Sequence, residues 1–228
     1  MKIKYVAISE TGRRGNNEDY FKVVEMPESN RLLAIVCDGM GGHACGEVAS
    51  ETVGNAISKY WQENAHAADN EEKVRAACRE ASGAMLRKSE ELELPEMGTT
   101  MVMASIEGDR LTVAHVGDSR CYLLRPGEGL LYLTEDHVAL SFGWEVVTRC
   151  FFSTHPEDAV PDIRQFDLQA GDRILLCSDG LHKSVEADSL PELMMEDKAL
   201  EDILHGFDIL CRKYGDDNYT AVLMEIES

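Results

Sequence analysis

Apolar runs and apolar stripes alternate along this chain and predict blocks of strands separated by helices. In the first block, residues 3–9, 20–25 and 31–37 have strand patterns, and the third is apolar throughout its second half, as in a strand buried on both faces. The apolar spacing then changes to three and four, which predicts two helices. Their apolar stripes are Ala49, Val53, Ala56, Ile57, Tyr60 and Trp61, followed by Val74, Cys78, Ala81 and Met85.

The second half of the chain repeats this order of strands and helices. Residues 135–157 have no clear period and are expected to be irregular. Two helices are predicted near the end, and the one over residues 200–214 stops at Gly215. Strands are expected at 99–106, 110–116, 120–124, 130–133, 163–168, 173–178 and 219–226. Strand blocks alternating with helix pairs indicate packed sheets with helices on their outer faces, in one domain over residues 1–228.

Composition narrows the range of partners. The chain has 228 residues and a net charge of -20, from 42 acidic against 22 basic residues. Nucleic acids and anionic membranes require basic patches, so neither is expected to bind. The first ten residues lack the apolar core of a signal peptide, and no apolar run approaches the roughly 18 residues that span a bilayer.

The cysteines favour a reducing compartment. There are seven of them, an odd number, and no two form a C-x-x-C pair. Neither a disulfide framework nor a zinc site is therefore indicated. A cytoplasmic location is expected, because thiols stay reduced there.

Five short segments place acidic residues where a pair of hard metal ions would need them. They contain Glu18, Asp38, Asp118, Asp179 and Asp217. In three of them the aspartate directly follows an apolar run with a strand pattern, which would hold the carboxylate rigidly. Oxygen ligands suit Mg²⁺ or Mn²⁺, and two such ions can bind and activate a water between them. The segments therefore predict a two-metal site.

In order and spacing, these segments resemble those of the metal-dependent Ser/Thr protein phosphatases, the type 2C or PPM family, in its bacterial branch. The resemblance covers nearly the whole chain, from Gly12 to the final strand. It implies an α+β fold, a four-layer αββα sandwich of two antiparallel sheets packed face to face, with helices on both outer faces. It also implies a monomeric enzyme that removes phosphate from phosphoserine and phosphothreonine in proteins and opposes a cognate Ser/Thr kinase.

The resemblance implies a role for most of the acidic residues. Asp38 bridges two Mg²⁺ or Mn²⁺ ions, and the carbonyl group of Gly39 helps to hold one of them. Asp179 and Asp217 bind the other ion. Glu18 lies near the ions and acts through coordinated water.

Further residues complete the implied site. Asp118 matches the family's ligand of a third, more weakly bound ion, shared with Asp179. Arg14 lies four residues before Glu18 and matches the phosphate-binding arginine, although its neighbour Arg13 leaves a shift of one position open. Asp19 is expected to support the site through hydrogen bonds.

The chemistry of a phosphate monoester agrees with these roles. The substrate is a dianion, so two divalent ions would neutralise it and lower the pKa of a bridging water. The resulting hydroxide would attack phosphorus directly, in line with the leaving oxygen and without a covalent phosphoenzyme. Arg14 would bind the non-bridging oxygens with its planar fork of donors.

Structural roles remain open for several of these residues. Asp38 and Asp179 each precede a glycine, as turn and cap residues often do. Asp118 can also be a structural residue. Thr99 and Thr100 are expected to start a buried strand near the site.

Histidines are not expected to act in the chemistry. Some relatives carry a candidate proton donor directly after Asp-Gly, where this chain has Met40. His43 lies three residues later and is not given that role, which a metal-bound water would take over. His137 and His115 are expected to be structural.

The segment after His137 departs from the family pattern. Relatives carry a longer flap there, whereas this chain reaches Val147-Thr148-Arg149-Cys150 within a few residues. A shortened flap would affect substrate selection and the third ion, and it would leave the two-metal ligands intact.

Other functions also fit part of the pattern. A pseudophosphatase would bind a phosphoprotein with little or no turnover, but it would be expected to lack one of Asp38, Asp179 and Asp217. A partner-switch component would act on one dedicated protein, and a small-molecule phosphatase is a further alternative.

Overall fold

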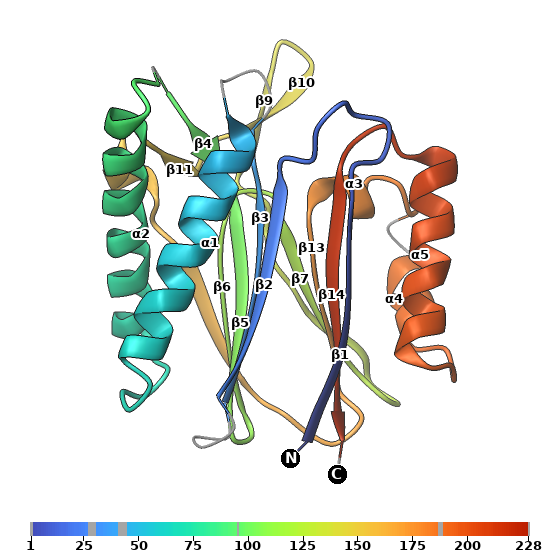
Figure 1. Cartoon of the computed structure of the whole chain (residues 1–228). Helices are drawn as coiled ribbons and strands as arrows, with labels where there is room; N and C mark the ends of the chain where they lie inside the picture. The colour runs from blue at the N-terminus through green and yellow to red at the C-terminus, as the bar shows by residue number, and fades with distance from the viewer. Residues whose placement is uncertain (1, 27–30, 41–44, 95, 187–188, 228) are drawn as a thin grey trace.

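The computed structural model describes residues 2–26, 31–40, 45–94, 96–186 and 189–227. Two five-stranded antiparallel sheets pack face to face at its centre, and helices cover the outer face of each (Figure 1). The predicted α+β fold, a four-layer αββα sandwich, is therefore confirmed.

The first sheet carries the two helices that the apolar stripes predict. α1 (Gly46–Glu63) and α2 (Glu71–Glu91) lie side by side over its outer face. The strand order is β12 (Asp162–Asp167), β6 (Arg110–Val116), β5 (Met101–Glu107), β3 (Arg31–Asp38) and β2 (Asp19–Met26).

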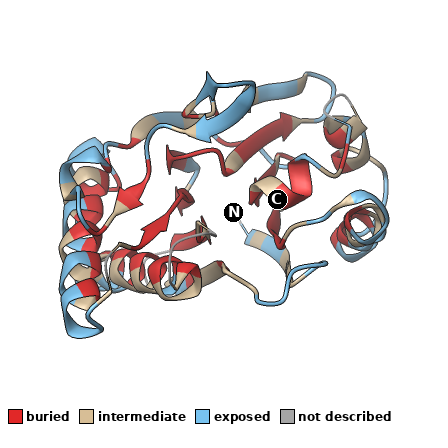
Figure 2. Cartoon of the chain, turned by 90° about the horizontal axis from the view of Figure 1, so that it is seen from above, coloured by how far each residue is buried: buried red, intermediate tan, exposed pale blue. Residues whose placement is uncertain are grey.

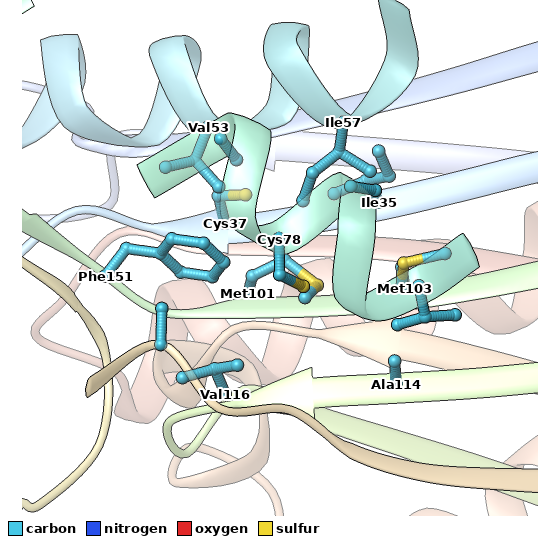
Figure 3. Close-up of a cluster of buried hydrophobic side chains, with 14 of the residues drawn as sticks. Ile35, Cys37, Val53, Ile57, Cys78, Met101, Met103, Ala114, Val116 and Phe151 are labelled. Atoms are coloured by element: carbon cyan, nitrogen blue, oxygen red, sulfur yellow. The ribbon is translucent and has the colours of Figure 1, made fainter. Parts of the chain in front are cut away.

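The apolar run in β3 is uninterrupted because both of its faces are buried. Successive side chains of β3 pack in two different clusters. One cluster, with α1 and α2, contains Leu33, Ile35 and Cys37, and the other, between the sheets, contains Leu32, Ala34 and Val36. Each of these six side chains is at most 3% exposed. Figure 3 shows the first of these clusters, in which Val53 and Ile57 of α1 point toward Cys37 and Ile35. A strand in this position has no polar face.

The second sheet is covered by the helices from the end of the chain. α5 (Leu200–Tyr214) packs on its outer face with the short helices α3 (Asp179–His182) and α4 (Ser189–Met194). The strand order is β1 (Lys2–Glu10), β14 (Tyr219–Glu227), β13 (Arg173–Cys177), β7 (Arg120–Arg125) and β8 (Gly129–Leu133). Seen from above, the central strands are mostly buried and the outward helix faces are exposed (Figure 2).

Part of residues 135–157 is regular, so the prediction of an irregular segment is wrong there. β9 (Val138–Ser141) and β10 (Trp144–Val147) form an antiparallel hairpin, β11 (Phe151–Phe152) pairs with β4 (Gly98–Thr99), and Pro156–Asp158 form a 3₁₀ turn. The hairpin has an alternating pattern, but its apolar side chains face solvent: Leu140, Phe142, Trp144 and Val146 are 80%, 101%, 77% and 48% exposed.

The strand expected at 99–106 is divided between β4 and β5. Thr100 lies at the break, and its backbone N–H donates a 2.9 Å hydrogen bond to the carbonyl oxygen of Asp38. Its hydroxyl accepts a 3.1 Å hydrogen bond from the N–H of Asp38. The break therefore fixes the end of β3, where a predicted metal ligand lies.

Helices within the described ranges are all too short or too polar to cross a bilayer.

Candidate active site

The acidic residues singled out in the sequence gather at one end of the sandwich. Asp38 ends β3, Asp179 begins α3 directly after β13, and Asp217 lies just before β14. Glu18 precedes β2, and Asp118 lies in the turn between β6 and β7. Their segments are far apart in the chain, yet all five residues line one open cavity of about 620 Å³, together with Arg14 and Gly39.

Backbone hydrogen bonds hold Asp38 and Gly39 in place. The N–H of Gly39 donates to the carbonyl oxygen of Glu18 at 3.1 Å, and the hydroxyl of Thr99 donates to the carbonyl oxygen of Asp38 at 2.9 Å. A Cβ on Gly39 would overlap the carbonyl groups of Gly46 and Glu18. Glycine is therefore required here by close packing of the backbone.

Asn218 connects the segments that carry Glu18 and Asp217. Its side-chain oxygen accepts a 2.9 Å hydrogen bond from the N–H of Glu18. Its amide group donates to the carbonyl oxygens of Thr11 and Asn16, both at 2.8 Å. With its side chain buried, Asn218 is a positioning residue that the sequence reasoning did not single out.

Asp19 supports the site through hydrogen bonds, as expected. It is 9% exposed, and the hydroxyl of Ser178 donates a 2.6 Å hydrogen bond to its carboxylate. Burial raises the pKa of Asp19 to about 7, although hydrogen bonds from Ser178 and Thr220 oppose the shift. Ser178 precedes Asp179, so this bond ties β2 to the start of α3.

Crowded carboxylates give the cavity a strong preference for cations. Burial raises the pKa of Asp38 well above its usual range, and the charges of Asp19, Asp179 and Asp118 add to the shift. The pKa of Asp118 rises to about 6, first from burial and then from Asp179. Burial raises that of Glu18 as well. Burial is thus the main cause of these shifts, and the neighbouring negative charges add to it.

Asp179 behaves differently because a lysine lies beside it. Burial alone would raise its pKa, but the ammonium group of Lys183 outweighs that effect and the pKa lies below its ordinary value. Lys183 Nζ is 2.6 Å from Asp179 Oδ2 and 3.7 Å from Asp118 Oδ2. The sequence reasoning missed Lys183, although its spacing of four from Asp179 on a short helix is a usable signal.

Arg14 faces the carboxylates, and Arg13 does not. The guanidinium Nη2 of Arg14 lies 2.7 Å from Asp217 Oδ2, whereas that of Arg13 donates to the carbonyl oxygen of Lys213 at 3.2 Å. The choice of Arg14 over its neighbour therefore agrees with the geometry. Its side chain is 55% exposed, which leaves donors free to meet a ligand in the cavity.

The donor set suits hard divalent ions. Apart from the guanidinium of Arg14, the polar groups that line the cavity are carboxylates, amides, hydroxyl and backbone groups, with no cysteine or histidine among the described residues. Oxygen donors of this kind favour Mg²⁺ or Mn²⁺ over zinc or copper. The residues present therefore fit a pair of such ions, with Asp38 between Asp179 and the segment of Glu18.

His115 and His137 have structural surroundings. His115 stacks on His137 with ring centroids 4.5 Å apart and planes at 17°, and the N–H of Gly117 donates to His137 Nδ1 at 3.1 Å. Asp162 lies 3.4 Å from His137 Nε2. Both ring nitrogens of His137 therefore already have partners, because Arg149 Nη1 also lies 3.3 Å from Nε2. His43 lies outside the described residues.

Comparison with known proteins agrees with the fold and the site. The chain matches the protein phosphatase 2C family model over residues 10–207. It is 34% identical to serine/threonine protein phosphatase PstP of Mycobacterium tuberculosis, over 99% of this chain and 45% of that protein. It therefore spans about half the length of this relative.

One further relative, and the catalytic domain of PstP taken alone, match over most of their own length. Serine/threonine phosphatase stp of Listeria monocytogenes is 33% identical, over 93% of this chain and 91% of that one. The crystal structure of the PstP catalytic domain in complex with two manganese ions is 32% identical, with a TM-score of 0.79 and coverage of 99% of both chains.

The fold agrees with these relatives, which are named serine/threonine protein phosphatases. The chain belongs to the protein phosphatase 2C family. The family predicted from the motifs is thus confirmed.

Proposed function

We propose that this chain hydrolyses phosphoserine and phosphothreonine in proteins by direct attack of water on phosphorus, at a site with two divalent ions. The observation that carries the proposal is the convergence of Asp38, Asp179 and Asp217 with Arg14 in one open cavity. Three ionised carboxylates from three separate segments would repel one another, so bound divalent ions would stabilise their convergence.

Asp38 and the carbonyl of Gly39, with Asp179 and Asp217, would hold two Mg²⁺ or Mn²⁺ ions, and Glu18 would act through their water. The two manganese ions in the PstP catalytic domain support this assignment. When bound, such ions neutralise the phosphate dianion and supply an activated water as nucleophile.

Arg14 would orient the phosphate. Its guanidinium presents a planar fork of donors and is half exposed at the cavity wall. In the described structure one of these donors is bonded to Asp217. The remaining donors can reach non-bridging oxygens, which would fix the ester for attack from the opposite side.

The β9–β10 hairpin supports a protein as substrate. Glu145, Val146 and Val147 line the same cavity as the aspartates, and the exposed Phe142 and Trp144 continue from it into solvent. Two large apolar side chains beside an open acidic cavity would have no contact with a small phosphate ester. They are suited to bury apolar groups that flank a phosphorylated residue.

A regulator that binds phosphoproteins with weak or no turnover is the alternative. The presence of Asp38, Asp179 and Asp217 at one cavity argues against it. Phosphatase action confined to one dedicated partner fits the same site equally well.

We further propose that residues 1–228 act as one phosphatase unit, monomeric and cytoplasmic, opposing a Ser/Thr kinase. The seven free cysteines agree with a reducing compartment.

A panel of phosphopeptides tests the substrate class. With Mn²⁺ present, phosphoserine and phosphothreonine peptides should release phosphate, phosphotyrosine peptides much less, and EDTA should abolish release from all of them. Broad activity on the panel would support a general phosphatase, and activity on a single phosphoprotein would support the dedicated one. Hydrolysis of nucleotides or sugar phosphates in preference to every peptide would contradict the proposal.

A further inference from the structure

Lys183 joins two carboxylates that come from different sheets of the sandwich. Asp118 follows β6 in the first sheet, and Asp179 follows β13 in the second. The ammonium nitrogen of Lys183 lies 2.6 Å from Asp179 Oδ2 and 3.7 Å from Asp118 Oδ2. One cation is thus shared by two acidic residues at the wall of the cavity.

The local backbone fixes this arrangement. The N–H of Lys183 donates to the carbonyl oxygen of Asp179 at 2.9 Å, which closes one helical turn and places the two side chains on the same face. His182 Nε2 donates to the carbonyl oxygen of Asp118 at 3.1 Å. The Asp118 side chain is 8% exposed, so it cannot turn away into solvent. Backbone and side-chain hydrogen bonds therefore keep Asp118, Asp179 and Lys183 close together.

We propose that Lys183 is a built-in cation that takes the place of a third metal ion between Asp118 and Asp179. The proposal rests on the proposed function, in which two ions are held by Asp38, Asp179 and Asp217. It replaces the third ion that the family resemblance implies for Asp118. The protein would then work with two exchangeable ions and one permanent charge.

Charge and geometry both favour this interpretation. A divalent ion on the same two Oδ2 atoms would lie about 2.0–2.2 Å from each of them, and therefore no more than about 5 Å from the lysine nitrogen. Two positive centres at that separation repel, and the lysine is covalently attached to the chain, so it is not lost by dissociation. Lys183 donates to Oδ2 of Asp179 at 2.6 Å, and an ion held with Asp217 would use Oδ1 of Asp179.

An ammonium group differs from a metal ion in ways that can be measured. It does not dissociate when metal is scarce, it carries one charge rather than two, and it brings no coordinated water. The number of ions bound per chain should therefore be two, even at Mn²⁺ concentrations of several millimolar, where weak sites fill.

The test counts bound Mn²⁺ per chain from the electron paramagnetic resonance signal of free Mn²⁺ during titration. Wild type and Lys183→Arg, which keeps the charge, should bind two ions. Lys183→Met keeps the length of the stem without the charge and should bind a third, weaker ion. Adding Asp118→Asn to Lys183→Met should return the count to two. Circular dichroism confirms that each variant is folded.

Asp118→Asn alone provides a second measurement that does not depend on Lys183→Met folding. In the wild-type background it should leave the count at two, because no ion is expected on Asp118. Three ions on wild type, loss of an ion in Asp118→Asn, or two ions on folded Lys183→Met would each overturn the proposal. Mn²⁺ binding that is absent, or unaffected by Asp38→Ala, would overturn the proposed function itself and this inference with it.

Discussion

Arg14 and Asp217 form an ion pair across the mouth of the cavity, 203 residues apart in the chain, with Nη2 and Oδ2 separated by 2.7 Å. This contact links the predicted phosphate-binding cation to a predicted metal ligand. A phosphate that enters the cavity would compete with Asp217 for the guanidinium, while metal ions would compete with Arg14 for the carboxylate.

Replacement of Arg14 by alanine should therefore affect substrate binding more than metal binding. A charge-assisted hydrogen bond contributes about 1.5–3 kcal/mol, which corresponds to a rise in KM for para-nitrophenyl phosphate of roughly tenfold to a hundredfold. The Mn²⁺ affinity should change little or rise, because Asp217 loses a competing cation. Steady-state kinetics and Mn²⁺ titration of Arg14→Ala, with Arg13→Ala as the matched control, check this. Equal kinetic effects in the two variants would contradict the assignment.

Gly39 and Gly206 should respond in opposite ways to substitution by alanine. A Cβ on Gly39 would overlap backbone carbonyl groups, so Gly39→Ala should cost several kcal/mol or prevent folding. Gly206 lies inside α5 with no atom within 4 Å of the added Cβ, so Gly206→Ala should stabilise the protein by about 0.5–1 kcal/mol. Urea unfolding of both variants gives the comparison, and a tolerated Gly39→Ala would show that the end of β3 can move.

The stability of the metal-free protein should fall as pH rises from 6.5 to 8.5. Asp19, with a pKa of about 7, and Asp38, with a pKa well above its usual range, hold protons in the folded state that the unfolded chain has already lost. Such groups stabilise the fold below the unfolded pKa, and the contribution is lost as pH passes the folded pKa. The window begins at 6.5 because His182, with its pKa lowered to about 4 by burial, acts in the opposite direction below that value.

The expected change is a fall in Tm of about 5 °C in EDTA over this window. Saturating Mn²⁺ should remove or reverse the trend, because metal ions bind the deprotonated carboxylates. Asp19→Asn should make the EDTA profile flatter. A Tm that rises with pH in EDTA would contradict the assignment of buried protonated carboxyl groups.

The exposed hairpin predicts a difference between protein and small substrates. Phe142→Ser combined with Trp144→Ser removes two side chains that are 101% and 77% exposed, so the fold should be unaffected. Loss of their contacts should raise KM for a phosphoprotein roughly tenfold, with kcat/KM for para-nitrophenyl phosphate within twofold of wild type. Ile209→Ser, on the outer face of α5, is the control. Equal losses on both substrates would mean that the hairpin acts on the site itself.

Much of this architecture could be predicted from the sequence because it depends on local rules. The run in β3 is apolar since both faces are buried, and the stripe on α1 repeats at helical spacing since one face is buried. The β9–β10 hairpin was not predicted because its apolar residues are not buried. Its alternating apolar side chains are exposed to solvent, and an alternating pattern by itself does not show whether a segment forms a strand.

The candidate site was predictable to the extent that each segment carries its own signal. An aspartate between an apolar run and a glycine marks Asp38 and Asp179, and family resemblance gives them roles. Contacts between distant segments carry no such signal. The hydrogen bond from Glu18 to Asn218 and the ion pair between Lys183 and Asp118 join distant segments and are evident only in the folded structure.

Hydrolysis of para-nitrophenyl phosphate by wild type, Asp38→Ala and Asp179→Ala tests the central claim most directly. With Mn²⁺, wild type should be active, EDTA should abolish the activity, and both variants should lose at least about a hundredfold in kcat, which corresponds to about 2.7 kcal/mol of transition-state stabilisation. Asp197→Ala, which removes an exposed aspartate outside the cavity, should match wild type. Absence of activity in folded wild type with Mn²⁺, or activity that persists in Asp38→Ala, would contradict the account.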